Sequence, residues 1–264
     1  MRTPFDRRLL RLRRDRVAHG SHDANFLIDE IRVRLVERLT EMKRSFSVVA
    51  ELGCRRGELS QHLQQSSPIG TLVQTDLSFA MLTQAAGFRV VADEEFLPFG
   101  ANTLDAVVSV FTLHWANDLP GCLAQIRYAL KPQGLFLAAM AGGNTLHELR
   151  RSLTRAELEM TGGTSPRVAP FVDTREAAAL LQRAGLKMPM ADFDRITIRY
   201  SQPMKLLSDL QAMGETSVLS DRSPSTPPKQ LMSRTLELYH ETCADEDGLI
   251  PATFDIVFLT GWKS

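Results

Sequence analysis

The stretch FSVVAELGCRRG, residues Phe46–Gly57, decides the fold of this chain. Its apolar first half ends at Gly53, as expected for a buried strand of a parallel sheet. Gly53 and Gly57 permit a tight turn in which the backbone can approach a ligand, and the helix predicted at Glu58–Gln65 presents unpaired N–H groups at its start. The stretch therefore predicts a strand, a ligand-binding loop and a helix.

The same alternation of strand and helix continues along the chain, which predicts an α/β domain with a mostly parallel sheet and covering helices. Further strands are expected at Thr71–Thr75, Arg89–Ala92, Leu104–Val110, Leu135–Met140, Phe193–Tyr200 and Phe254–Thr260. Helices are expected at Phe79–Ala86, Leu119–Leu130, His147–Met160, Thr174–Ala184, Met204–Met213 and Lys229–Cys243, the last two separated by the Ser/Pro-rich loop Ser220–Pro228. We expect an N-terminal helical lid over residues 1–45 and one domain over 46–264, with a helical insertion at about 201–250 between the last two strands.

Acidic residues follow two of the predicted strands. Asp76 ends the second strand, and Asp93 follows the third. A carboxylate at the first position can accept both hydroxyls of a ribose, and one at the second can accept from an adenine amino group. The loop after Phe46–Leu52 has neither the phosphate-loop pattern with its lysine nor the G-x-G-x-x-G spacing. The pattern predicts a nucleoside site at the strand ends.

The composition excludes several classes of protein. The 264 residues carry 31 Lys plus Arg and 31 Asp plus Glu, whereas a duplex DNA binder needs a basic excess, so we expect no nucleic acid partner. No apolar run approaches the roughly 18 residues that a membrane-spanning helix needs. Three scattered cysteines (Cys54, Cys122 and Cys243) predict neither a disulfide framework nor a zinc site and favour a reducing compartment, the cytoplasm.

The N-terminal segment is locally basic. Seven arginines lie within residues 1–16, and Phe5–Val17 has the pattern of a helix with apolar contacts at Phe5, Leu9 and Leu10. Two interpretations are open: a solvated basic helix, or a lid over an anionic substrate.

Four segments resemble the ordered motifs of the class I S-adenosylmethionine-dependent methyltransferases: Glu51–Gly57, Asp76-Leu77-Ser78, Asp93 and Asp105–Ser109. The resemblance implies a Rossmann-like fold, a seven-stranded mostly parallel sheet whose last strand is antiparallel, and S-adenosyl-L-methionine as cofactor. The cofactor-binding residues that it implies are Glu51, Gly53, Cys54, Arg55, Gly57, Asp76, Leu77, Asp93, Glu94 and Ser109.

A narrower resemblance covers nearly the whole chain. It rests on Phe5-Asp6-Arg7, Asp93–Phe99, Leu113–Pro120, Gly142–Arg150, Asp209–Glu215, Pro251-Ala252-Thr253 and Gly261-Trp262-Lys263. These motifs resemble the methyltransferase-fold assembly factors of mitochondrial respiratory complex I and their bacterial relatives, and more distantly the malonyl-carrier-protein O-methyltransferases. The resemblance implies a protein substrate, with a complex I subunit as one candidate, peripheral contact with that membrane complex, and arginine hydroxylation as an alternative reaction.

Arg55 departs from the family, which usually has glycine at this position of the cofactor loop. Three interpretations are open. The guanidinium can pair with the carboxylate of the cofactor in a bidentate geometry, it can crowd the site, or it can point to solvent.

The sequence offers little else for catalysis, which suits an in-line methyl transfer because proximity and alignment do most of the work. His114 follows the fourth strand, where it either acts as a base, orients the acceptor, or is a packing residue beside Trp115. No Asn-Pro-Pro-Tyr segment is found there, which disfavours amide and base N-methyltransferases. The six histidines include no H-x-D/E pair, so no metal site is predicted. Methyl transfer is the leading hypothesis, and arginine hydroxylation and a non-catalytic scaffold are the alternatives.

Overall fold

The computed structural model describes residues 3–66, 69–222 and 228–264. Within them the strands form one seven-stranded sheet in the order β3-β2-β1-β4-β5-β7-β6. The strands are β1 Phe46–Leu52, β2 Ile69–Asp76, β3 Phe88–Val91, β4 Leu104–Val110, β5 Leu130–Ala141, β6 Lys187–Tyr200 and β7 Ile250–Trp262. Every neighbouring pair is parallel except the two pairs made by β7, which runs antiparallel to β5 and to β6. The α/β fold with an antiparallel last strand is confirmed.

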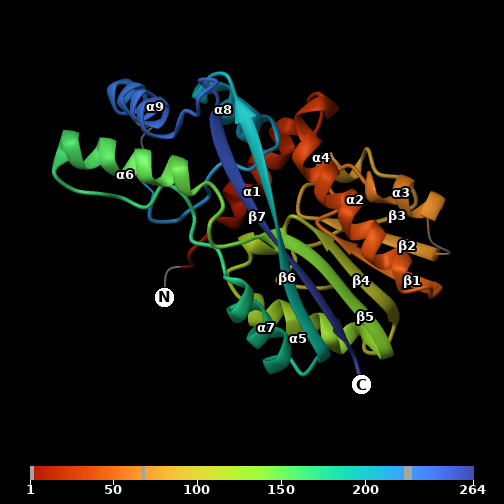
Figure 1. The fold of residues 1–264 in the computed structure, drawn as a ribbon. Coiled ribbons are helices and arrows are strands. Elements are labelled where there is room, and N and C mark those ends of the chain that lie inside the picture. The colour runs from red at the N-terminus through yellow and green to blue at the C-terminus, as the bar shows by residue number, and fades with distance from the viewer. Residues whose placement is uncertain (1–2, 67–68, 223–227) are drawn as a thin grey trace.

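Helices cover both faces of the sheet (Figure 1). They are α1 Arg7–Val17, α2 Phe26–Glu41, α3 Leu59–Ser66, α4 Phe79–Leu82, α5 Leu119–Ala129, α6 His147–Thr161, α7 Thr174–Arg183, α8 Pro203–Ala212 and α9 Lys229–Cys243, with short 3-10 turns at His22–Asn25 and Leu113–Trp115. The apolar residues of α2 and α3 pack on one face, and those of α5 and α7 pack on the other. Alternate residues of β4 supply the two cores: Ala106 and Val108 face the first, and Val107 faces the second.

The sequence pattern predicted these elements, but several of the predicted strands are shorter than the observed ones. β5 begins at Leu130 instead of Leu135, β6 at Lys187 instead of Phe193, and β7 at Ile250 instead of Phe254. The extra residues of β6 and β7 are held by the antiparallel pairing of these two strands, from Lys187↔Trp262 to Tyr200↔Ile250, which no short window of sequence reveals. Conversely, α4 ends at Leu82, short of the predicted Ala86.

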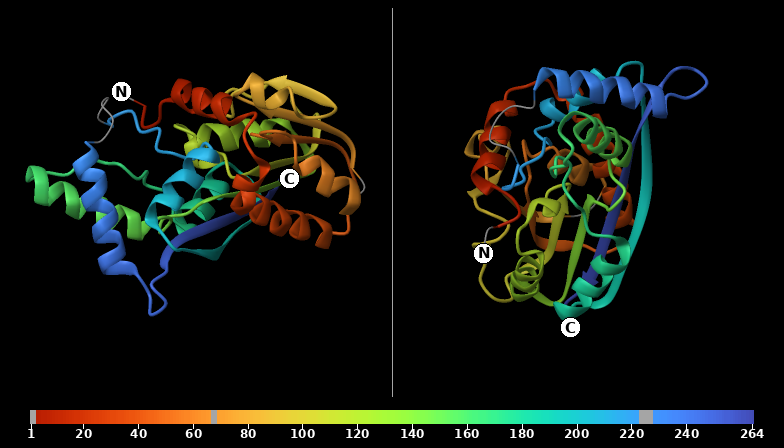
Figure 2. Two further views of the ribbon diagram at one scale, coloured as in Figure 1. Left: turned by 90° about the horizontal axis from the view of Figure 1, so that it is seen from above. Right: turned by 90° about the vertical axis from the view of Figure 1, so that its left-hand side faces the viewer.

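The segments outside the sheet have separate roles. Helix α2 contributes to the main core, whereas α1 lies across the strand ends and is tied to the loop before α9 by a bridge between Phe5 and Leu219. Helices α8 and α9 lie between β6 and β7 in the chain, and α9 packs beside α6 (Figures 1 and 2). The predicted loop Ser220–Pro228 falls largely on residues 223–227, which lie outside the described part of the chain.

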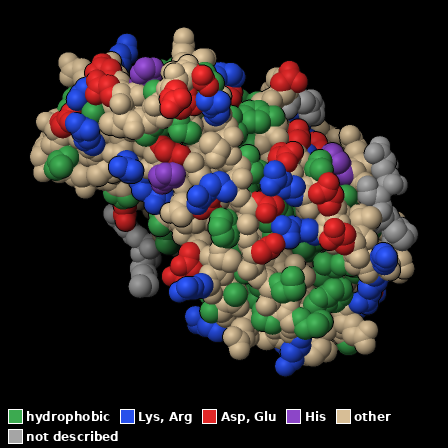
Figure 3. Space-filling view, viewed as in Figure 1, with side chains coloured by type: hydrophobic (Ala, Val, Ile, Leu, Met, Phe, Trp, Pro, Cys, Tyr) green, Lys and Arg blue, Asp and Glu red, His purple; other side chains and the backbone are tan. Residues whose placement is uncertain are grey.

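The outer surface is mixed in charge. Basic and acidic side chains are interspersed on the face drawn in Figure 3. Arg34 and Arg38 of α2 pair with Asp194 and Asp192 of β6, for example. In the part of the chain that the structure describes, no helix is long and apolar enough to cross a membrane.

Candidate cofactor and acceptor site

The loop after β1 is shaped by two glycines with positive φ, Gly53 at 67° and Gly57 at 79°. A Cβ at Gly53 would lie 2.5 Å from the Thr112 methyl group, so only glycine lets Thr112 approach the loop. The Cys54 N–H donates to the Thr75 carbonyl at 2.8 Å, which fixes the loop against the end of β2. The loop therefore lies beside the switch point between β1 and β4, where open α/β sheets bind ligands.

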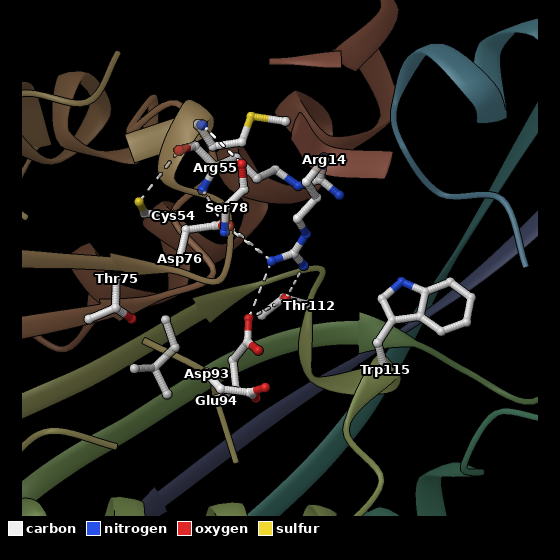
Figure 4. Close-up of polar contacts among 12 residues, drawn as sticks. Arg14, Cys54, Arg55, Thr75, Asp76, Ser78, Asp93, Glu94, Thr112 and Trp115 are labelled. Atoms are coloured by element: carbon white, nitrogen blue, oxygen red, sulfur yellow. Dashed lines mark hydrogen bonds and ion pairs between the residues drawn. The ribbon is translucent and has the colours of Figure 1, made fainter. Parts of the chain in front are cut away.

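Asp76 ends β2 at this switch point and is fully buried. Its carboxylate accepts from the backbone N–H groups of Arg55 at 3.0 Å and Ser78 at 2.8 Å. The remaining partner is Arg14 of α1, whose guanidinium lies 3.3 Å from both carboxylate oxygens (Figure 4). Burial raises the pKa of Asp76, and this effect is larger than the lowering by Arg14, because the pair is removed from water.

Glu94 and Asp93, which follow β3, extend the acidic group. Glu94 is buried, receives a hydrogen bond from the Thr112 hydroxyl at 3.0 Å and forms ion pairs with Arg7 and Arg14. Burial alone would raise the pKa of Glu94, but the two arginines outweigh it and lower that pKa to about 2. Arg7 also reaches Asp93 at 2.5 Å. Two arginines from one helix thus neutralise three carboxylates from two strand ends.

The carboxylate acceptors suit the nucleoside half of S-adenosylmethionine, and α1 covers them. Two backbone N–H groups orient Asp76 so that its carboxylate is available to the hydroxyls of a ribose, which donate as Arg14 does here. The buried Nε of Arg14 has no partner among the described residues, so this guanidinium is incompletely satisfied. Entry of a nucleoside at Asp76 therefore requires Arg14 to withdraw.

The structure contradicts one of the three interpretations of Arg55, the one in which its side chain points to solvent. Its φ of 56° is left-handed, which fits a position where glycine is usual. The side chain is buried, not solvent-facing: it donates to the Met213 carbonyl at 2.8 Å and forms an ion pair with Glu215. Arg55 thereby links the cofactor loop to the segment after α8.

His114 lies in the same network but has no free ring nitrogen. Its Nε2 lies 3.2 Å from a Glu215 oxygen, and its Nδ1 accepts from the Ala141 N–H at 3.5 Å. The ring packs against Phe111, Trp115 and Phe171. Burial lowers the pKa of His114, which favours the neutral imidazole with its proton on Nε2. The geometry is that of a packed residue that holds Glu215 in place.

The other predicted cofactor residues are dispersed around the crevice. Glu51 accepts from the Gln74 amide at 2.9 Å inside the sheet, and burial raises its pKa to about 8. The Ser109 hydroxyl donates to the Leu52 carbonyl, and Leu77 packs near Phe5. The Cys54 thiol is buried, and burial raises its pKa. These residues shape the strand ends, whereas Gly53, Arg55, Asp76, Asp93 and Glu94 converge.

Sequence reasoning missed Arg7, Arg14, Thr112 and Glu215. A signal was present for the first two: they are seven residues apart, so they share one face of a helix. Nothing local marks Thr112 or Glu215, since their role comes from segments distant in sequence. Glu215 receives hydrogen bonds from Arg55 and from the Trp115 indole N–H at 2.8 Å. Burial would raise the pKa of Glu215, but Arg55 and His114 lower it to about 2.

A cavity of about 620 Å³ adjoins this network. It lies between α1, α6, α8 and the segment after α8, and Trp115 and Glu215 form part of its wall. Glu215 also pairs with Arg55, so this residue joins the cavity wall to the loop after β1. Among the described residues, no group of three or more His, Cys, Asp or Glu side chains has a geometry for holding a metal ion.

Known proteins are similar to this chain in sequence and in fold. A family described as "Methyltransferase domain" matches residues 50–138. The arginine-hydroxylase NDUFAF5, mitochondrial, of Rattus norvegicus is 40% identical over 266 residues, which cover 98% of this chain and 77% of that protein. A malonyl-acyl-carrier-protein O-methyltransferase of Gallionella capsiferriformans is 28% identical over 98% of this chain and 91% of its own length. The solved structure of YcgJ from Bacillus subtilis has the same fold, with a TM-score of 0.61, 12% identity, and coverage of 87% of this chain and 98% of that one.

Proposed function

We propose a function for this chain from one premise: it belongs to the family of the mitochondrial arginine hydroxylase NDUFAF5. The chain carries a methyltransferase domain on a Rossmann-like sheet. In the proposal it binds S-adenosyl-L-methionine at the ends of β1, β2 and β3 and methylates a protein or carrier-protein substrate. The observation that supports this most is that Asp76, which accepts from the glycine loop, lies together with Asp93 and Glu94 around the arginines of α1.

Each residue has a specific part in the proposal. Asp76 accepts hydrogen bonds from the ribose hydroxyls once Arg14 has withdrawn. Asp93 accepts a hydrogen bond from the adenine amino group. Gly53 and Gly57 keep the loop close to the ligand, and the Arg55–Glu215 pair joins that loop to the wall of the cavity. The cofactor supplies a methyl group on a sulfonium centre. The acceptor enters by way of the cavity, and Trp115 separates it from water.

Hydroxylation of an arginine is the second candidate. The observation that favours it is the identity of 40% to proteins named as arginine hydroxylases, against 28% to the named O-methyltransferase. The Asp76–Glu94–Thr112 group also holds a guanidinium, that of Arg14, in a fully buried position. A subunit of respiratory complex I is the candidate protein substrate in this case. In both cases we propose a cytoplasmic enzyme, in keeping with its free cysteines.

Two measurements test the proposal. Calorimetry with S-adenosylhomocysteine should detect binding, and Asp76→Asn should weaken that binding by roughly 30-fold, about 2 kcal/mol, because a charge-assisted contact to the ribose is lost. Asp192→Asn, at a surface carboxylate paired with Arg38, is the matched control. Absence of binding in the unchanged protein would leave the scaffold alternative.

Mass spectrometry separates the two reactions. The candidate partner proteins are compared from cells with and without this chain. A mass increase of one methylene group on the target supports methyl transfer, and an increase of one oxygen supports hydroxylation. If neither is found while the cofactor binds, the assigned substrate class is wrong.

A further inference from the structure

The cavity beside the cofactor crevice has a lining that the cofactor does not explain. Its volume of about 620 Å³ suits a small molecule or a long side chain. Helix α1 supplies one wall with Arg13, Arg16 and Val17, and the segment after α8 supplies Thr216, Ser217 and Arg222. The cavity is therefore closed by the same two segments that the Phe5–Leu219 bridge holds together.

Three of the cavity arginines form no ion pair with any described residue. Arg13 donates to the carbonyl oxygens of Thr216 and Ser217, which are uncharged partners. The ion pairs formed within the described residues include none made by Arg13, Arg16 or Arg222. Burial and the neighbouring charges of Arg222 and Arg16 lower the pKa of Arg13 to about 10. The nearby Glu215 is already occupied by Arg55 and Trp115. This cationic cluster is thus a site of mutual repulsion that an anion would relieve.

The opposite wall of the cavity is apolar. Leu149 and Leu153 of α6, Leu207 and Leu210 of α8, and Phe171 and Met232 line it. Such a lining stabilises an aliphatic chain by roughly 25 cal/mol per Å² of apolar surface removed from water. A ligand complementary to both walls has an anionic group attached to an apolar chain.

We propose that this cavity binds a carboxylate on an apolar chain, with the carboxylate against Arg13, Arg16 and Arg222 and the chain against α6 and α8. The identification of this ligand as the acceptor rests on the proposed function, because Glu215 joins the cavity wall to the proposed cofactor loop through Arg55. The binding itself does not depend on that function. The same charges disfavour an arginine side chain in this cavity, since three guanidinium groups would repel a fourth.

Titration with three probes of equal chain length tests the charge preference. Decanoate, decanol and decylammonium are added to the full chain without cofactor, and binding is followed by calorimetry. We expect decanoate to bind at least about tenfold more tightly than either other probe, since charge-assisted hydrogen bonds to arginine add to the shared apolar contact. Equal affinities for the three, or a preference for decylammonium, would overturn the proposal.

Matched variants locate the site. Arg13→Gln and Arg222→Gln should each reduce decanoate affinity by about tenfold and leave decanol unchanged. Arg16→Gln changes an exposed side chain at the rim, so it keeps the test valid if the other variants fold poorly. Arg11→Gln, exposed on α1 outside the cavity, is the control and should have no effect. An equal loss of decanoate affinity in the Arg11→Gln variant would mean that the preference for decanoate comes from the overall charge of α1 and not from this cavity. Because S-adenosylhomocysteine binding is measured separately, failure here is distinguishable from failure of the proposed function.

Discussion

The Arg14 guanidinium occupies the place where a ribose is expected in this fold. It is fully buried and contacts Asp76, Glu94 and Thr112, which belong to three different strand ends. A buried carboxylate that loses its only cation is strongly destabilised, whereas a ribose can replace the lost hydrogen bonds without the charge. The stability of the free protein and its affinity for a nucleoside are therefore coupled through one side chain.

We predict that Arg14→Gln lowers the free energy of unfolding of the free protein by about 3 kcal/mol and raises its affinity for adenosine by about tenfold. The reason is that the wild-type guanidinium competes with the ribose for Asp76. Chemical denaturation and adenosine calorimetry measure the two quantities, with Arg11→Gln as the control. Weaker adenosine binding in the Arg14 variant would show that Arg14 holds the ligand and does not compete with it.

Glu51 provides a pH-dependent prediction. Burial raises its pKa to about 8 in the folded protein, above the usual value of 4.5. Its contribution to stability is thus fully present below about pH 4.5 and is lost as the pH rises through 8. Glu51→Gln imitates the protonated form and keeps an acceptor for the Gln74 amide. We expect the variant to gain stability relative to wild type between pH 5 and pH 9, measured as the difference in urea midpoint. A difference that does not change with pH would contradict the raised pKa.

Helix α1 is attached to the domain by both apolar and charged contacts. Leu10 is fully buried, and Phe5 packs edge-on against Trp115. Asp6 caps the helix by accepting from the Leu9 N–H, and its own N–H donates to the Val218 carbonyl at 2.8 Å. The helix is therefore more than a solvated basic face, because Arg14 is buried and Arg7 is half-buried against the acidic strand ends.

We predict that deletion of residues 1–16 leaves a folded domain of reduced stability. The core formed by α2 and the sheet stays intact, but Asp76 and Glu94 lose their cations, which should cost about 3–5 kcal/mol of unfolding free energy. Circular dichroism and urea denaturation test both statements. The double variant Arg8→Gln/Arg11→Gln removes two exposed charges of the same helix and should be close to wild type. Complete unfolding of the truncated chain would make α1 part of the essential core.

At the level of the complete domain, the crevice is assembled from segments far apart in the sequence. The carboxylates come from β2 and β3, the covering arginines from α1, and the cavity wall from α6, α8 and residues 215–222. The sheet is the common support, since its parallel strands bring their carboxyl ends to one edge. The covering segments meet each other directly at the Phe5–Leu219 bridge. A change in α1 therefore affects the cofactor crevice and the adjoining cavity together.

The sequence by itself determined the sheet, the antiparallel last strand implied by the family resemblance, and the acidic strand ends at Asp76 and Asp93. These features depend on local patterns, because apolar runs, glycines and the residues that follow a strand can be read from short stretches of sequence. Tertiary structure alone decided the partner of each charge. Arg14 reaches Asp76 across 62 residues, and Arg55 reaches Glu215 across 160. Such pairing depends on which buried groups the packed elements bring within a few ångströms. Because these groups are removed from water, a buried charge without its partner would destabilise the fold. No local window contains that information.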